Sequence, residues 1–438
     1  MIDPLRVTIV GGGLAGPLMA CLAARGGHTV TLIEQRSDPR KAGYSGGRSI
    51  NLALSARGRE ALRRIELEDR VLEDVVAMPG RMIHDVQGRT SFQAYSCIPG
   101  EAILSVSRGG LNCMLLDAAE ACDGVTIVFG DRCTSIDLDA PSVQLESSKQ
   151  IDADLIIGTD GAASVVRAAM DNVAPIDAGG GLIDATYKEL CIPAGPDGQW
   201  LMEPHALHIW PRGNRMMIAL PNADGSFTVT CFWPASGPES FEALPDRAAI
   251  EACFGREYQD AIKLMPTLVE DFLGNPTGVL GTVRCNRFHH GDSAVLVGDA
   301  AHAVVPFFGQ GMNAAFQGCL KLIDSMERSD DLATALAGYD ALHRVDAGAI
   351  SDLALQNFIE MRSHTASRVF RLKTSLQKRL NGLFPRAYQP LYNLISFSTM
   401  PYSEVVELVR RRHRRMALIG GVLTGLVVFC VLFLTGVI

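Results

Sequence analysis

An α/β fold built around a parallel sheet is predicted by two features of this sequence. Short runs of apolar and β-branched residues end three times in a glycine-containing turn that leads into a helix-like segment. Between the second and third of these repeats, three β-rich runs alternate with turn residues, which predicts an antiparallel sheet inserted into the first fold unit. The chain has 438 residues, long enough for two such units with large cores.

The first repeat, residues 7–34, carries the strongest motif. An apolar strand leads into Gly11-x-Gly13-x-x-Gly16, a helix follows, and a second strand ends at Glu34. Gly11 allows the tight turn, Gly13 lets the backbone approach a pyrophosphate, and Gly16 lets helix and strand pack closely. The helix N-terminus offers free N–H groups to the phosphates, and Glu34 can accept a hydrogen bond from a ribose hydroxyl. This βαβ unit predicts a Rossmann-like dinucleotide-binding domain.

The other two repeats place polar turns after further strands. GTDG at 158–161 precedes a helix that carries Arg167, and a strand over 294–297 ends in Gly298-Asp299. The turn GQGMN at 309–313 then places backbone N–H groups at a helix N-terminus, where they can face an electron-rich ring. Because the carboxyl ends of parallel strands share one edge of the sheet, these turns together predict one extended ligand that crosses that edge.

Between the first two repeats, the segment GYSGG at 43–47 matches the nucleophile elbow of α/β-hydrolases around Ser45. That motif needs an apolar strand directly before it, and the preceding RSDPRKA is not one, so we interpret the segment as a loop over a cofactor. We expect a helix over 51–67, strands and turns from 71 to 106, and a helix over 111–122. Arg108 precedes that helix and can meet a phosphate with its fork of donors.

The expected organisation continues with a meander of strands over 207–233 and a helical pattern over 333–380. In the helical pattern Asn357, Glu360 and Met361 share one helix face. The predicted domains are a cofactor-binding domain in two parts, 1–180 and 281–330, an antiparallel-sheet substrate subdomain at 181–280, a helical region at 331–409, and a membrane anchor at 410–438.

The predicted anchor is the uncharged apolar segment 416–438, which would span about 34 Å as a helix, enough to cross a bilayer. Five arginines between 410 and 415 precede it, and such clusters favour the cytoplasmic side and anionic headgroups. We therefore expect a C-terminal transmembrane helix in a lipid bilayer, with the catalytic part facing the cytoplasm, in a bacterial inner membrane or a mitochondrial outer membrane.

Composition excludes several other classes of protein. A hydrophobic content of 47% with 20% charged residues fits a folded protein, and a net charge of −8 argues against a nucleic-acid partner. The 11 cysteines are scattered without the spacing of a metal site, so we expect reduced thiols and no metal. The first apolar run is the nucleotide strand itself, so we expect no signal peptide.

The three signatures, GGGLAG with Glu34, GTDG with Arg167, and GDAAH followed by GQGMN, resemble the flavin-dependent aromatic hydroxylases, the group of p-hydroxybenzoate hydroxylase. Longer strings narrow the resemblance to the kynurenine 3-monooxygenases over nearly the whole chain. These strings are GRSINLALSARG (47–58), RMIH (81–84), ILSVSR (103–108), MMIALPN (216–222), VPFFGQGMNA (305–314), NFIEMR (357–362) and PLY (390–392).

The resemblance implies an enzyme that uses FAD, NADPH and O₂ to convert L-kynurenine to 3-hydroxy-L-kynurenine in tryptophan degradation. The NADPH is expected to visit without a Rossmann domain of its own. The residues implied for FAD are Gly11, Gly13, Ala15, Gly16, Glu34, Gln35, Arg36, Ala53, Arg108, Asp299, Gly311, Met312 and Asn313. Those implied for the substrate are Arg81, Tyr95, Asn357 and Tyr392, with Glu360 and Met361 on the same helix face as Asn357.

The substrate assignments make chemical sense, because Arg81 can form a bidentate pair with the substrate carboxylate and the two tyrosines can add hydrogen bonds. No catalytic residue is assigned, since some relatives carry a histidine where this chain has Phe308. Three alternatives remain open: a related hydroxylase for another aromatic acid, a membrane-tethered flavoprotein oxidase or reductase without oxygen insertion, and a hydrolase built on GYSGG.

Overall fold

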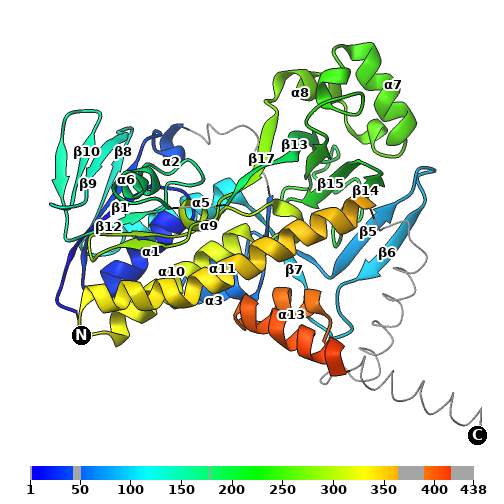
Figure 1. Cartoon of the computed structure of the whole chain (residues 1–438). Coiled ribbons are helices and arrows are strands. Elements are labelled where there is room, and N and C mark those ends of the chain that lie inside the picture. The colour runs from blue at the N-terminus through cyan, green and yellow to red at the C-terminus, as the bar shows by residue number, and fades with distance from the viewer. Residues whose placement is uncertain (1, 43–50, 177–178, 364–388, 416–438) are drawn as a thin grey trace, which may run out of the picture.

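The structure, a computed structural model, describes residues 2–42, 51–176, 179–363 and 389–415 (Figure 1). The apolar stretches form a central sheet of six strands in the order β18-β19-β12-β1-β2-β8. Its strands are β1 (Arg6–Val10), β2 (Thr29–Glu34), β8 (Val125–Phe129), β12 (Leu155–Gly158), β18 (His289–His290) and β19 (Ala294–Leu296). All neighbours pair in parallel except β18, which pairs antiparallel with β19. The predicted α/β fold with a parallel sheet is therefore confirmed.

The order of this sheet explains how distant turns meet. Strand β1 lies between β2 and β12, and β12 pairs with β19. The turns that follow these strands therefore share one edge, as the sequence predicted. Helix α1 (Ala15–Arg25) packs against α5 (Arg108–Glu120) and α10 (Gly311–Arg328), and their apolar faces form one continuous core with the sheet.

A three-stranded sheet beside this core corrects one expectation. Residues 51–67 were expected to form a single helix, but β3 (Asn51–Leu54) precedes α3 (Ala56–Arg64). The strand pairs antiparallel with β7 (Ile103–Ser107), which also pairs with β4 (Val76–Met78). Ser55 between strand and helix is extended, with φ −116° and ψ −178°. Pairing with a strand about fifty residues away thus overrides the local helical pattern.

Short elements complete this half of the molecule. A three-stranded antiparallel sheet holds β9 (Cys133–Asp137), β10 (Ser142–Leu145) and β11 (Gln150–Asp152). The helices are α2 (Pro39–Ala42), α4 (Glu68–Leu72), α6 (Val165–Val173) and α9 (Asp299–His302), with a 3-10 turn η3 (Pro306–Phe308).

The second unit is a seven-stranded sheet in the order β17-β13-β16-β15-β14-β5-β6. Its strands are β5 (Gly80–His84), β6 (Thr90–Ala94), β13 (Gly181–Ile192), β14 (Leu207–Arg212), β15 (Arg215–Pro221), β16 (Phe227–Trp233) and β17 (Gly278–Thr282). The predicted meander is confirmed as β14, β15 and β16. The β5–β6 hairpin joins this sheet by the parallel pairing of β5 with β14, although it comes from the early part of the chain.

Two helices, α7 (Arg247–Glu257) and α8 (Leu268–Gly274), lie above this sheet in Figure 1, with the 3-10 turns η1 (Phe241–Ala243) and η2 (Ile262–Leu264). Their aromatic residues pack with Trp210 and Trp233 of the sheet in a second core. Each of the two large sheets thus has a large hydrophobic core of its own.

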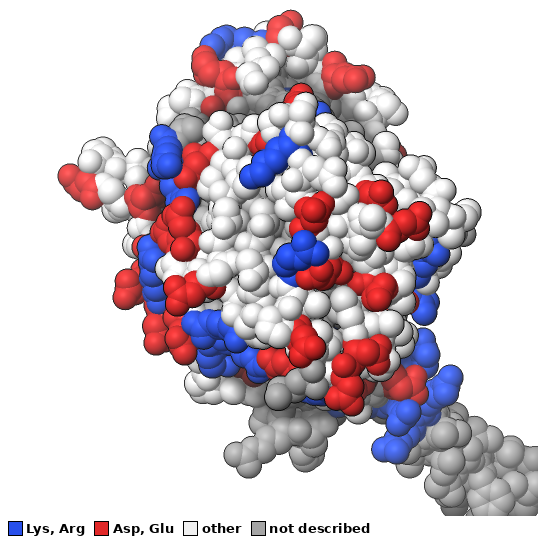
Figure 2. Space-filling view, turned by 90° about the vertical axis from the view of Figure 1, so that its left-hand side faces the viewer, with Lys and Arg blue, Asp and Glu red and all other residues white. Residues whose placement is uncertain are grey.

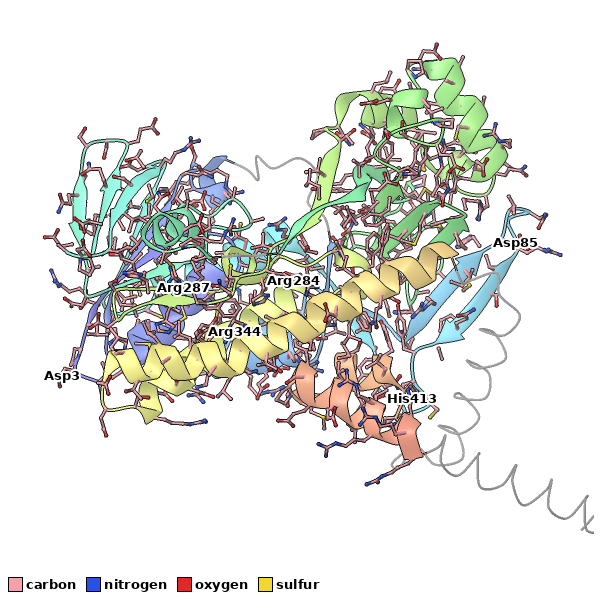
Figure 3. The ribbon with its side chains drawn as sticks, viewed as in Figure 1. Asp3, Asp85, Arg284, Arg287, Arg344 and His413 are labelled. Carbon is pink, nitrogen blue, oxygen red and sulfur yellow. The ribbon has the colours of Figure 1, made fainter. Side chains whose placement is uncertain are left out.

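The long helix α11 (Leu332–Ser363) runs across both units (Figure 1). Arg284 holds it through an ion pair with Asp352 at 2.6 Å, and Figure 3 shows Arg284 beside this helix. Helix α13 (Leu391–Phe397) and a helix over 402–415 pack below α3 and α10. Acidic and basic side chains are interspersed over the face shown in Figure 2.

The prediction of a transmembrane helix is corrected by the structure. Within the described ranges, no helix is both long and apolar enough to cross a membrane. The longest, α11, carries charged residues such as Asp340, Arg344 and Asp352 along its length, and the helix over 402–415 ends among arginines. This finding overturns the predicted bilayer contact and membrane location as well; the segment 416–438 on which they were placed lies outside the described residues.

Candidate active site

The turn after β1 is closed by its glycines. Gly11 has φ +109°, and a Cβ on it would come within 2.7 Å of the backbone of Thr159 and Asp160. A Cβ on Gly16 would lie 1.9 Å from the carbonyl oxygen of Gly11. A Cβ on Gly13 would meet nothing within 4 Å, so this residue borders open space. Two glycines are thus required by the protein's own packing, and the third leaves room for a ligand.

Side chains that surround the turn hold its shape. Glu34 is buried, and its two carboxylate oxygens accept from the backbone N–H of Gly12 at 2.8 Å and of Arg36 at 2.9 Å. Burial opposes ionisation, but these bonds and the Arg36 guanidinium together lower the pKa of Glu34. Asn112 of α5 donates to the carbonyls of Gly12 and Gly13, both at 3.1 Å.

The neighbouring turn after β12 interlocks with the first. The hydroxyl of Thr159 donates to the Gly11 carbonyl at 2.8 Å, and Asp160 caps α6 by accepting from the N–H of Val165 at 2.6 Å. Burial raises the pKa of the Asp160 carboxyl. Arg167 donates to the carbonyl of Ala300 at 2.8 Å, which ties this turn to the third one.

Asp299 begins α9 at the third strand end, directly after Gly298 with φ +65°. Its side chain is exposed, yet the protein atoms that surround it raise the pKa of its carboxyl, while Arg108 lowers that pKa. A carboxyl that is exposed and yet has such surroundings is partly enclosed by the chain and still open to a ligand. Arg108, also exposed, is the positive group that the structure brings near it from the start of α5.

The turn 309–313 lies beside strand β3. Asn313 is fully buried, accepts from the N–H of Ser55 at 2.9 Å and donates to the carbonyl of Ala53 at 2.8 Å. A Cβ on Gly309 would lie 3.0 Å from the Cβ of Ala53, so strand β3 and this turn touch. Gly311 and Met312 follow as the first residues of α10. The residues predicted to face the cofactor ring, Ala53 and the turn 309–313, thus lie together.

Glu189 of β13 is a titratable group that the sequence analysis did not select. It is half-buried, and burial raises its pKa to about 7, with Arg108 acting in the opposite direction. Tyr187, two residues earlier on the same face of the strand, has its pKa raised by burial and by Glu189. The inserted sheet therefore places a carboxyl with a pKa near neutrality close to Arg108 at the start of α5.

Three of the predicted substrate residues form one cluster. The guanidinium of Arg81 on β5 lies 5.2 Å from the ring centroid of Tyr95 and 5.4 Å from that of Tyr392 on α13. The two tyrosine rings stack at 4.9 Å, and Phe308 stacks on Tyr392 at 5.7 Å. Burial raises the pKa of both tyrosine hydroxyls, and Arg81 opposes this rise. The guanidinium of Arg81 and the neutral hydroxyls of Tyr95 and Tyr392 thus lie close together in one cluster.

Asn357 of α11 lies on another side of the same region. Its amide donates to the carbonyl of Phe307 at 2.7 Å. The Phe307 ring stacks on Phe358 at a centroid distance of 4.5 Å and lies tilted against Phe232 at 5.1 Å. The three phenylalanines border a small pocket of about 20 Å³ beside the β14–β15 hairpin. Glu360 and Met361 fall in the last turns of α11, and their side chains lie outside the described part of the chain, as does GYSGG.

The turns that follow β1, β12 and β19 form, together with the turn 309–313, what we call the cofactor cradle. This cradle adjoins the cluster of Arg81, Tyr95 and Tyr392. Ala53, which touches the turn 309–313, also packs in one apolar cluster with Tyr95 and Phe397, and Phe308 directly precedes that turn. Asn112, Gln310 and Glu189 are the site residues that sequence reasoning missed. Only Asn112 left a signal, since it stands four residues after Arg108 on the same helix face.

Comparison with known proteins agrees with this geometry. The FAD-binding domain family (FAD_binding_3) matches residues 4–328. A kynurenine 3-monooxygenase from Stenotrophomonas maltophilia is 44% identical over 91% of this chain and 89% of its own. One from Myxococcus xanthus is 43% identical over 90% of this chain and 86% of its own.

Solved structures show the same fold at lower identity. A 2-methyl-3-hydroxypyridine-5-carboxylic acid oxygenase aligns with a TM-score of 0.66 at 20% identity, covering 84% of this chain and 95% of its own. A probable FAD-dependent monooxygenase from Pseudomonas aeruginosa aligns with a TM-score of 0.65 at 19% identity, covering 82% and 97%.

The parallel sheet with its three interlocked turns, the open space at Gly13 and the domain match define an FAD-dependent monooxygenase fold. Within this class, the extent and identity of the curated relatives place the chain in the kynurenine 3-monooxygenase family. The predicted family and the use of FAD are thereby confirmed.

Proposed function

We propose that the protein hydroxylates L-kynurenine to 3-hydroxy-L-kynurenine, with NADPH as reductant and O₂ as oxidant. The observation that carries this proposal is the cluster of Arg81, Tyr95 and Tyr392 beside the ring end of the cradle. A guanidinium flanked by two hydroxyls suits a carboxylate attached to an aromatic ketone, because it offers charge, directed donors and flat apolar surface together.

The cradle residues fit FAD. The open space at Gly13 and the N-terminus of α1 would receive the pyrophosphate, and Asp299 would accept from a ribityl hydroxyl. One oxygen of Glu34 already holds the glycine turn at Gly12 and the other accepts from Arg36, so a ribose hydroxyl would bond to a carboxylate that both of them contact. Ala53 and the backbone of Gly311, Met312 and Asn313 would face the ring. Once reduced by NADPH, bound FAD supplies the activated oxygen that the reaction needs.

The remaining tasks belong to the substrate side. Arg81 pairs with the carboxylate of kynurenine, and the hydroxyls of Tyr95 and Tyr392 add hydrogen bonds. Asn357 addresses a polar end of the substrate from α11. Because the amino group already activates the substrate ring, no strong base is required, and the protein acts by orientation and by the exclusion of water. The packed rings of Phe232, Phe307 and Phe358 form the apolar wall that would exclude water.

The test is NADPH consumption by the FAD-loaded protein with and without L-kynurenine, with the product identified by mass. We expect consumption to rise with kynurenine and to be matched by a product one oxygen atom heavier. Consumption that yields only H₂O₂ would overturn the proposed function, and stimulation by a different aromatic acid alone would overturn the substrate.

A further inference from the structure

A buried guanidinium ties the C-terminal segment to the cofactor-binding half. Arg57 of α3 is fully buried and donates through its two terminal nitrogens to the carbonyls of Ile395 and Met400. Its guanidinium also lies over the ring of Tyr402, 4.0 Å from the centroid. A buried cation is costly unless its donors are satisfied; here the two terminal nitrogens are bonded, while Nε has no partner among the residues described. The contacts that are made fix the backbone around residues 395–402 against α3.

The same segment reaches the turn at the ring end of the cradle. The hydroxyl of Tyr402 donates to Oε1 of Gln310 at 3.0 Å, and both side chains are almost completely buried. Gln310 directly precedes α10 within the turn 309–313. Its neighbour Asn313 is bound to Ser55 and Ala53, so the turn is held from the strand side by one residue and from the C-terminal side by the other.

The segment also carries a substrate residue. Ile395, whose carbonyl Arg57 holds, lies one turn after Tyr392 in α13. A second anchor fixes the helix over 402–415, because Asp346 of α11 accepts from the N–H of Ser403 at 3.0 Å and also pairs with Lys321. Tyr392 and the turn 309–313 are therefore connected through three buried side chains, Arg57, Tyr402 and Gln310.

We propose that Arg57, Tyr402 and Gln310 form a positioning latch, which sets Tyr392 and the turn 309–313 at a fixed separation so that substrate and cofactor ring meet in one geometry. The latch acts on the reaction of the proposed function. It contacts neither substrate nor cofactor ring, and it works by restricting the two groups that do. When the latch is loosened, NADPH is still oxidised, but less of it is converted to hydroxylated product.

The variant that isolates the latch is Tyr402→Phe, which removes the hydroxyl and keeps the ring under Arg57. We expect the product formed per NADPH oxidised to fall about fivefold, the shift that one lost buried hydrogen bond produces in an equilibrium. The visible absorption spectrum of bound FAD should also shift, because Gln310 beside the turn then keeps only the longer contact with the Ser55 hydroxyl, at 3.5 Å. The matched control is Tyr339→Phe, whose buried hydroxyl donates to the Leu296 carbonyl at 3.1 Å, away from the latch.

Gln310→Met, which removes the acceptor from the other side, provides the second variant. It should give the same fall and spectral shift, and the double variant should fall no further than either single one. Product yield and spectrum equal to those of Tyr339→Phe, or losses that add in the double variant, would overturn the latch. If the wild-type protein makes no hydroxylated kynurenine, the proposed function fails, and the FAD spectrum still decides on the latch.

Discussion

The cofactor cradle and the substrate cluster are built in different ways. The cradle is made of backbone turns at the ends of β1, β12 and β19, and its critical positions are glycines where a Cβ would collide. The substrate cluster is made of long side chains, Arg81 and Tyr392 among them, from a hairpin and a helix separated by about three hundred residues. One region is therefore sensitive to added atoms, and the other to removed ones.

The largest effect is expected from Gly16→Ala in the cradle. The new Cβ would lie 1.9 Å from the Gly11 carbonyl oxygen, so we expect a loss of at least about 3 kcal/mol in unfolding free energy and protein without FAD. Gly13→Ala is the matched control, because its Cβ meets nothing; it should fold normally and bind FAD at least about tenfold more weakly. Thermal unfolding measures the stability of the two variants, and flavin absorbance measures the FAD that they bind. Equal losses of stability in Gly16→Ala and Gly13→Ala would contradict the different roles given to these two glycines.

On the substrate side, Arg81→Met should leave FAD bound and raise the Kd for L-kynurenine about 30- to 100-fold, the effect of losing a charge-assisted bidentate contact. The control is Arg89→Met on the same hairpin, whose side chain is 78% exposed and pairs only with Asp85 and Gln87 among the residues described. Titrating the two FAD-loaded variants with L-kynurenine measures the Kd of each. An unchanged Kd in Arg81→Met would remove Arg81 from the substrate site.

Glu189 lies near Arg108 of the cradle, and its pKa gives a pH-dependent prediction. With a folded pKa of about 7 against an ordinary 4.5, the folded state holds a proton that the unfolded state releases between these values. Stability is therefore lost as pH rises from 4.5 to 7. Because Glu189→Gln is always neutral, its free energy of unfolding at pH 8 should exceed that of wild type by about 2 kcal/mol, after allowance for partial exposure. At pH 4.5 the two free energies of unfolding should be equal. Urea unfolding of the FAD-free protein at both pH values measures this, with exposed Glu242→Gln as control. Equal gains at both pH values would contradict it.

The smallest effect should come from Asn112→Ala, which tests whether side chains as well as glycines shape the cradle. Two hydrogen bonds to the Gly12 and Gly13 carbonyls are lost, and we expect the Kd for FAD to rise about fivefold. Fluorescence titration with FAD measures the change. Unchanged FAD affinity would mean that the glycine turn keeps its shape without this amide.

The difference in construction also explains what the sequence could predict. The cradle follows from local order, strand then turn then helix, and parallel pairing alone brings Gly11, Asp160 and Asp299 to one edge. Arg81, Tyr95 and Tyr392 carry no local pattern, and only a family resemblance could select them. Glu189 and Gln310 were missed because their roles depend on neighbours from other segments.

Two expectations failed for physical reasons. The helix expected over 51–67 begins as strand β3, because β7 offers a pairing edge that helical periodicity does not reveal. The transmembrane helix was inferred from an apolar run and the arginines that precede it, and within the described residues the structure contains no helix that can cross a membrane.

The most direct test of the proposed reaction is turnover under isotopically heavy oxygen gas. The FAD-loaded protein would receive NADPH and L-kynurenine, and the product would be weighed by mass spectrometry. We predict one labelled oxygen atom in 3-hydroxy-L-kynurenine and close to one product molecule per NADPH consumed. An unlabelled product, or label found only in H₂O₂ and water, would contradict oxygen transfer at this site.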